Sequence, residues 1–125
     1  LTGTKHGCEL GECGTRRVLV DGRPVLSCLM LATEAIGCSI ETVEGLESAG
    51  ALHPLQKHFA FMSAAQCGYC TPGYIMSVKV LLDRTDKPTP DDIEEAVSGN
   101  ICRCTGYTKI VDAIHLAADR MAGRV

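Results

Sequence analysis

The sequence lacks any hydrophobic run long enough to cross a membrane. Its longest apolar stretch, Val25 to Ala32, is interrupted by a serine and a cysteine, whereas a membrane-spanning helix needs about 20 mostly apolar residues. An excess of positive charge is also absent, because the formal net charge is −3 and the basic residues are scattered along the chain. We therefore expect no membrane span and no nucleic-acid partner.

Several functional patterns are missing as well. The chain begins at Leu1 and shows no signal-peptide order of charged, apolar and small residues. It contains no Ser-His-Asp order, no paired-carboxylate motif and no phosphate-binding loop. The four histidines have no metal-ligand spacing, which favours structural roles for His6, His53, His58 and His115. Cysteine is the residue type that carries the chemistry.

The first part of the chain has the pattern of a small α+β unit. Two β-prone runs, residues 17–20 and 23–27, flank Asp21-Gly22, a dipeptide typical of two-residue hairpin turns. Apolar residues then recur at helical spacing over 29–36, up to Gly37, and residues 39–43 alternate like a strand. These patterns predict a hairpin, a helix and a further strand.

The second part has the pattern of four helices. Pro54 suits the first turn of a helix that we expect to end near residue 63. Thr71-Pro72 and Thr89-Pro90 each combine a capping residue with a proline, and predict helices through about residues 84 and 98. An apolar stripe follows Thr108 and predicts a last helix. The stretch 44–51, rich in Gly, Glu and Ser, is the expected linker between residues 1–50 and 51–125.

Half of the eight cysteines form two tight pairs, Cys67-x2-Cys70 and Cys102-x-Cys104. Each pair comes just before a predicted helix, whose N-terminal N–H groups favour an anionic ligand. Four thiolates are the number that a 2Fe-2S cluster requires. Zinc also accepts four cysteines, but a one-residue gap fits its usual spacing poorly. A disulfide framework fits less well, because Cys102 and Cys104 could hardly pair with each other.

A second group of cysteines begins in the loop GCELGECGTRRV, residues 7–18. Cys8 and Cys13 have the spacing of a plant-type ferredoxin loop, C-x4-C-x2-C, and Cys28 provides a distant further thiol. The third loop position is Arg16, whose guanidinium stays protonated and cannot ligate iron. Three interpretations stay open: a sequence error across residues 15–17, a cluster completed by a non-cysteine ligand, or a lobe without a cluster.

Two other groups of residues are candidates for supporting roles. Cys38 is a possible substitute ligand, but its position between a helix-ending glycine and a strand favours a small buried thiol. Tyr69, Tyr74 and Tyr107 flank the paired cysteines. They are expected either to shield a cluster from water or to satisfy local carbonyl groups with their hydroxyls.

Two motifs resemble those of a known family. QCGYCTPG, residues 66–73, and GNICRCTGY, residues 99–107, are similar to segments of the iron-sulfur subunit of the molybdenum hydroxylases, the xanthine oxidase family. The opening LTGTKHGC, the segment DGRPVLSC ending at Cys28, and the connector from ETVEGL to LHPLQ also resemble that subunit. The resemblance therefore covers nearly the whole chain.

The resemblance implies two 2Fe-2S units. The first, residues 1–50, would be a β-grasp ferredoxin-like lobe that is incomplete at its N-terminus, because family members carry a further stretch before LTGTK. The second, residues 51–125, would be a four-helix 2Fe-2S-binding domain. Together they give an α+β fold.

The resemblance also implies a ligand set for each unit. The helical-domain cluster, nearest the molybdenum cofactor, would be held by Cys67, Cys70, Cys102 and Cys104. Gln66 and Cys104 match positions that contact the pterin, and a glutamine amide offers both donors and an acceptor to it. The ferredoxin-lobe cluster would take Cys8, Cys13 and Cys28, with Arg16 at the fourth position.

The function implied is that of a non-catalytic electron-transfer subunit. It would pass single electrons from molybdopterin on a large partner subunit toward FAD on a medium subunit, in the reducing cytoplasm where thiolate clusters are assembled. The alternatives are a free-standing ferredoxin-like carrier, a zinc-stabilised interaction module and a metal-free redox switch.

Overall fold

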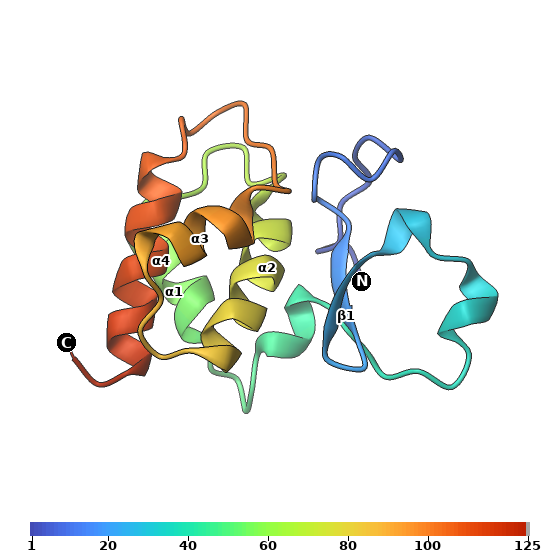
Figure 1. Ribbon diagram of the computed structural model, residues 1–125, viewed down its shortest axis with the longest axis horizontal. Helices are drawn as coiled ribbons and strands as arrows, with labels where there is room; N and C mark the ends of the chain where they lie inside the picture. The colour runs from blue at the N-terminus through green and yellow to red at the C-terminus, as the bar shows by residue number, and fades with distance from the viewer. Residues whose placement is uncertain (125) are drawn as a thin grey trace.

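A computed structural model describes residues 1–124. The strands and three short 3-10 helices come first in the chain, and four α-helices follow (Figure 1). We call residues 1–46 the sheet region and residues 54–124 the helical region. None of the helices in residues 1–124 is long and apolar enough to span a bilayer. The mixed α and β content agrees with the expected fold class.

The sheet has three antiparallel strands in the order β2-β1-β3. The central strand β1, Arg17–Val20, pairs with β2, Arg23–Leu26, and on its other side with β3, Ile40–Glu41. Asp21 and Gly22 connect β1 to β2 with φ of 49° and 75°. A two-residue hairpin needs positive φ at both central positions, and the predicted hairpin is confirmed.

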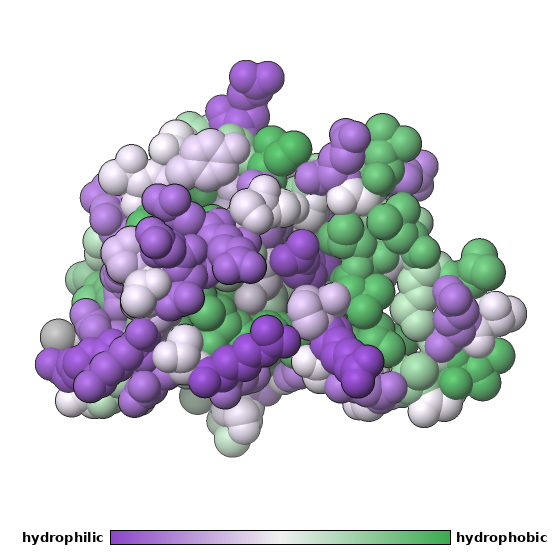
Figure 2. Space-filling view, in the orientation of Figure 1, coloured by the Kyte–Doolittle hydropathy of each residue, from purple (hydrophilic) through white to green (hydrophobic). Residues whose placement is uncertain are grey.

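The predicted helix over residues 29–36 is wrong. This segment contains parts of two 3-10 helices, η1, Ser27–Leu29, and η2, Ala32–Ala35. Leu29, Leu31 and Ile36 are 64%, 68% and 80% exposed, so the helical spacing has no packing surface to stabilise it, and short helices are marginal without one. The space-filling view shows apolar surface gathered over the sheet region (Figure 2).

Two further expectations for the sheet region need correction. The strand predicted over 39–43 is limited to Ile40–Glu41, because η3, Val43–Leu46, follows at once and buries Leu46. The start of the expected linker is thus ordered structure. Cys38 is half-buried rather than buried, because the segment before it does not form the helix that would have covered it.

All four helices predicted for the second part are confirmed. They are α1, Pro54–Phe61; α2, Thr71–Arg84; α3, Pro90–Val97; and α4, Thr108–Met121. Helix α2 is the central element, because it packs against α1, α3 and β1. The largest fully buried side chains of the core come from all four helices: Leu55, Phe59, Tyr74, Met76, Val78, Ile93, Ile110 and Ile114.

The helix starts are fixed by local hydrogen bonds. Thr89 caps α3 as predicted, since its hydroxyl accepts the Asp92 N–H and the Asp92 carboxylate accepts the Thr89 N–H at 2.7 Å. For α1 the cap is His53, whose Nδ1 accepts the Leu55 N–H at 3.2 Å. Thr71 is the first residue of α2 rather than its cap, because the N-cap is Cys70.

Candidate metal centre

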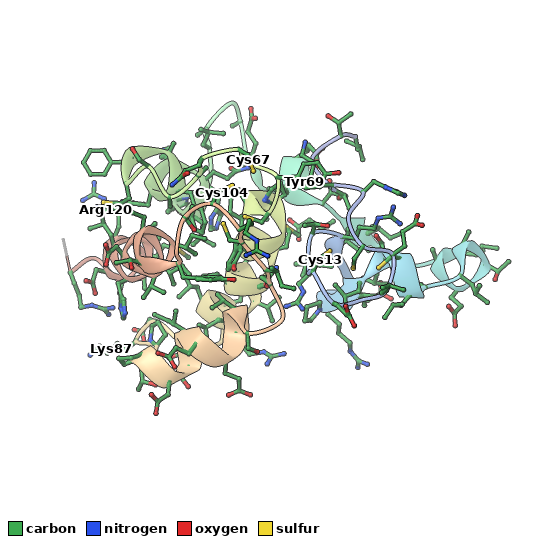
Figure 3. All side chains as sticks on the ribbon, turned by 90° about the horizontal axis from the view of Figure 1, so that it is seen from above. Cys13, Cys67, Tyr69, Lys87, Cys104 and Arg120 are labelled. Atoms are coloured by element: carbon green, nitrogen blue, oxygen red, sulfur yellow. The ribbon has the colours of Figure 1, made fainter. Side chains whose placement is uncertain are left out.

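The four paired cysteines come together at one end of the helical region. Cys67 and Cys70 lie in the loop before α2, and Cys102 and Cys104 lie in the loop before α4. The Sγ atoms of Cys67 and Cys104 are 3.6 Å apart, and the Cys70 and Cys102 thiols also interact with each other. Each sulfur pair therefore combines one cysteine from each loop. Figure 3 shows Cys67 and Cys104 close together.

This pairing fits a cluster of two metal ions. A tetrahedral ion with metal–sulfur bonds of about 2.3 Å holds two thiolates roughly 3.7 Å apart, close to the 3.6 Å between Cys67 and Cys104. Two such pairs give each iron of a 2Fe-2S cluster its two thiolates. The two sulfur pairs thus have the two-by-two arrangement that a 2Fe-2S cluster needs.

One sulfur pair is buried and the other is exposed. Cys70 and Cys102 are 9% and 7% exposed, whereas Cys67 and Cys104 lie at the surface. Burial raises the pKa of Cys70 to about 12, so this thiol is neutral until a bound metal displaces its proton. Burial also raises the pKa of Cys102, but hydrogen bonds from Thr105 outweigh it and lower that pKa. The Thr105 hydroxyl lies 3.1 Å from the Cys102 sulfur.

Residues with positive φ shape both loops around the sulfurs. Gly68, between Cys67 and Cys70, has φ of 78°, and Gly106, after Cys104, has φ of 64°. Glycine adopts this left-handed conformation without steric cost. The chain then turns into α2 and α4, so that both helix N-termini lie beside the thiols, as the sequence predicts. Their free N–H groups favour negative charge there.

The three tyrosines hold the loops in place. The Tyr74 hydroxyl, fully buried, donates to the Asn100 carbonyl at 2.7 Å, and the Tyr107 hydroxyl accepts the Cys102 N–H at 3.2 Å. The Tyr69 hydroxyl donates to the His6 carbonyl. Tyr69 and Tyr74 therefore satisfy backbone carbonyls, which is one of the two expected roles.

The residues matched to pterin contacts lie on the exposed side of this site. Gln66 and Cys104 are both exposed, and Gln66 directly precedes Cys67. Their side chains are accessible to a partner subunit. Pterin contact itself stays a prediction.

The ferredoxin-type loop, residues 7–17, holds its two sulfurs with backbone amides. Cys8 Sγ accepts the N–H groups of Leu10 and Cys13, each at 3.4 Å, and Cys13 Sγ accepts the Cys8 N–H at 3.4 Å. The Leu10 amide and the neighbouring donors lower the pKa of Cys8 to about 6. Cys28 lies in η1 and is half-buried. Arg16 donates from Nη2 to the Glu9 carboxylate at 3.2 Å.

A polar network that no sequence pattern predicts joins the two cysteine regions. Asn100 is 4% exposed, donates from Nδ2 to the Gly14 carbonyl at 3.3 Å, and places Oδ1 2.7 Å from Ser77 Oγ. The Arg17 guanidinium donates to Ser77 Oγ at 2.8 Å. Burial lowers the pKa of Arg17. The chain's one asparagine is thus the residue that links the regions.

Backbone contacts make the same junction tight. The Ile101 N–H donates to the Cys13 carbonyl at 3.1 Å. This hydrogen bond connects the backbone directly before Cys102 to the backbone of Cys13. A Cβ atom on Gly73 would lie 2.3 Å from the Gly14 carbonyl oxygen. Only glycine therefore allows α2 to approach the ferredoxin-type loop this closely.

Comparisons with known proteins agree with this site. Residues 42–115 match the 2Fe-2S binding domain family. The small FeS subunit of nicotinate dehydrogenase from Eubacterium barkeri is 48% identical over 122 residues, covering 98% of this chain and 78% of that protein. The xanthine dehydrogenase iron-sulfur-binding subunit of Escherichia coli O157:H7 is 46% identical, covering 91% of this chain and 73% of that protein.

A solved structure gives the same result in three dimensions. Quinoline 2-oxidoreductase from Pseudomonas putida 86 matches with a TM-score of 0.89 and 48% identity, covering 99% of this chain and 78% of that one. The paired thiols, the family match and these relatives together support an electron-transfer role. The chain belongs to the 2Fe-2S binding domain family, among the small iron-sulfur subunits of the xanthine oxidase-type molybdenum hydroxylases.

Proposed function

We propose that this subunit receives single electrons from a molybdopterin-bearing large subunit through the site formed by Cys67, Cys70, Cys102 and Cys104. A 2Fe-2S cluster bound there accepts and releases one electron at a time. The observation that carries the proposal is the asymmetry of the two sulfur pairs. The exposed pair, with Gln66 beside it, provides the side on which the pterin would approach.

The buried pair suits the release of electrons. Cys70 and Cys102 face the protein interior, where exclusion of water lowers the local dielectric and tunes the potential of a cluster. We propose that electrons leave toward an FAD-bearing subunit, and that the complex works in the cytoplasm. We also propose a ferredoxin-like unit over residues 1–50, of β-grasp type, and a helical 2Fe-2S unit over 51–125.

The test uses the complex purified with its partner subunits. Cys70→Ser should remove about two irons per chain and one reduced 2Fe-2S signal in electron paramagnetic resonance, because serine is a poor replacement for a thiolate ligand. The matched control is Cys38→Ser. Cys38 is bound to the Glu34 carbonyl at 3.4 Å, away from the paired cysteines, so its replacement should leave the iron content unchanged.

A second variant tests the direction of approach. Gln66→Ala should keep the iron content and the cluster spectrum but slow reduction of the cluster by substrate through the molybdenum centre, assayed on a panel of N-heterocycles and aldehydes. The matched control is Gln56→Ala, because Gln56 lies in α1 and binds the Val43 carbonyl. Equal reduction rates in both variants and the wild type would contradict the role of Gln66.

A further inference from the structure

The ferredoxin-type loop, residues 7–17, has the backbone of a cluster-binding loop without the full ligand set. Amide N–H groups point at the sulfurs of Cys8 and Cys13, as in a loop that stabilises anionic sulfur. The position that should supply the next thiolate carries Arg16. The residues of this loop therefore do not fit a four-thiolate 2Fe-2S cluster.

Arg16 cannot act as an iron ligand. Its guanidinium carries five donors and no acceptor, and it stays protonated in proteins. The side chain is 18% exposed and its Nη2 is 3.2 Å from the Glu9 carboxylate. Because Glu9 directly follows Cys8, this ion pair ties the Arg16 side chain to the loop, at the sequence position where a cluster-binding loop would place another thiolate.

Three candidates for a substitute ligand, Glu9, His6 and Cys38, are engaged elsewhere. The Glu9 carboxylate that binds Arg16 is also 2.5 Å from His6 Nε2, so both of these side chains are paired. Cys38 donates to the Glu34 carbonyl, and burial together with Asp21 raises its pKa. Asp21, which affects Cys38, directly follows β1, whereas Arg16 directly precedes β1. Cys38 therefore lies at the opposite end of that strand from Arg16.

From these contacts we infer that the ferredoxin-type loop holds no 2Fe-2S cluster, and that this subunit is a one-cluster relay. Cys8, Cys13 and Cys28 are then free thiols, and the loop is a structural element that buttresses the helical site through Asn100 and Ile101. An electron acceptor must consequently approach the helical site itself. This last consequence rests on the proposed function, whereas the absence of a second cluster does not.

The experiment counts iron and acid-labile sulfide per chain in the intact complex, with protein quantified by amino-acid analysis. Four proteins are compared: the wild type, Cys28→Ser, Arg16→Cys and the control Arg23→Cys, which places a thiol on the exposed strand β2. Tryptic peptides from the same preparation verify arginine at position 16. Reduced samples are also recorded by electron paramagnetic resonance.

We expect about two irons and one 2Fe-2S signal in the wild type, in Cys28→Ser and in Arg23→Cys. Arg16→Cys should rise to about four irons and show a second signal, because it restores the four-thiolate set. About four irons in the wild type, a loss of iron in Cys28→Ser, or no gain in a folded Arg16→Cys protein would overturn the inference. If Arg16→Cys does not assemble, the wild-type and Cys28→Ser counts decide. A wild-type count near zero would instead contradict the proposed function.

Discussion

At the residue scale, Asn100 connects the two groups of cysteines, because its side chain bonds both the Gly14 carbonyl and the Ser77 hydroxyl. The spacing of Cys67, Cys70, Cys102 and Cys104 predicted one shared site, and the structure brings their sulfurs together in two pairs. Asn100 gave no comparable signal, because a buried amide network depends on contacts between distant segments. Such contacts follow from the tertiary structure and leave no periodicity in the sequence. His53 gave none because histidine is not among the preferred N-cap residues.

His53 makes the stability of the subunit depend on pH. Burial and the nearby Lys79 lower the pKa of His53 below its usual value of 6.5, and the neutral ring accepts the Leu55 N–H. As the pH falls below 6.5, the unfolded chain therefore binds this proton more readily than the folded chain does. The free energy of unfolding should fall as the pH drops from 6.5 toward the folded-state pKa.

The variant His53→Asn tests this expectation. Asparagine is a good N-cap and does not titrate, so the variant should show a smaller loss of melting temperature between pH 7.5 and 5.5 than the wild type, at matched ionic strength. Both proteins are compared with the cluster bound. An equal loss in the two proteins would assign the pH dependence to another group.

At the element scale, the helix starts were readable because they rest on local chemistry. Thr89-Pro90 and Pro54 marked α3 and α1 to the residue, since a cap and a proline act within one turn. The helix predicted over residues 29–36 does not form, because apolar residues at helical spacing form a helix only where another surface packs against them. The exposure of Leu29, Leu31 and Ile36 shows that nothing in residues 1–124 does so.

The first turn of α2 offers an element-scale prediction. Gly73→Ala should gain roughly 1 kcal/mol from helix propensity, but its Cβ would lie 2.3 Å from the Gly14 carbonyl oxygen, and such overpacking costs about 1–3 kcal/mol. The neighbour is backbone and cannot rotate away. We therefore expect a net loss of stability, seen as a melting temperature a few degrees lower.

The matched control is Gly45→Ala in η3. There the new Cβ would meet the Glu41 side chain at 3.2 Å, and this flexible side chain can move aside. The melting temperature should change little. A wild-type melting temperature in Gly73→Ala would show that α2 and the ferredoxin-type loop can separate without cost.

At the scale of the whole molecule, hydrogen bonds join the sheet region and the helical region at the cysteine loops. Ser77 and Asn100 are buried in the network that half-buried Arg17 joins, and unpaired buried polar groups would cost about 1–3 kcal/mol each if the regions moved apart. A clusterless ferredoxin-type loop would therefore still be needed for stability.

The hydrogen bond from the Ile101 N–H to the Cys13 carbonyl makes the rate at which this junction opens measurable. Ile101 has a 53% exposed side chain, so its amide proton is shielded mainly by that one bond across the two regions. In deuterated water this proton should exchange only when the regions part, and therefore more slowly than the amide of the neighbouring exposed Arg103. Its exchange rate, followed by mass spectrometry, would report how often the molecule opens between its two cysteine loops. Exchange as fast as that of Arg103 would mean that they part freely.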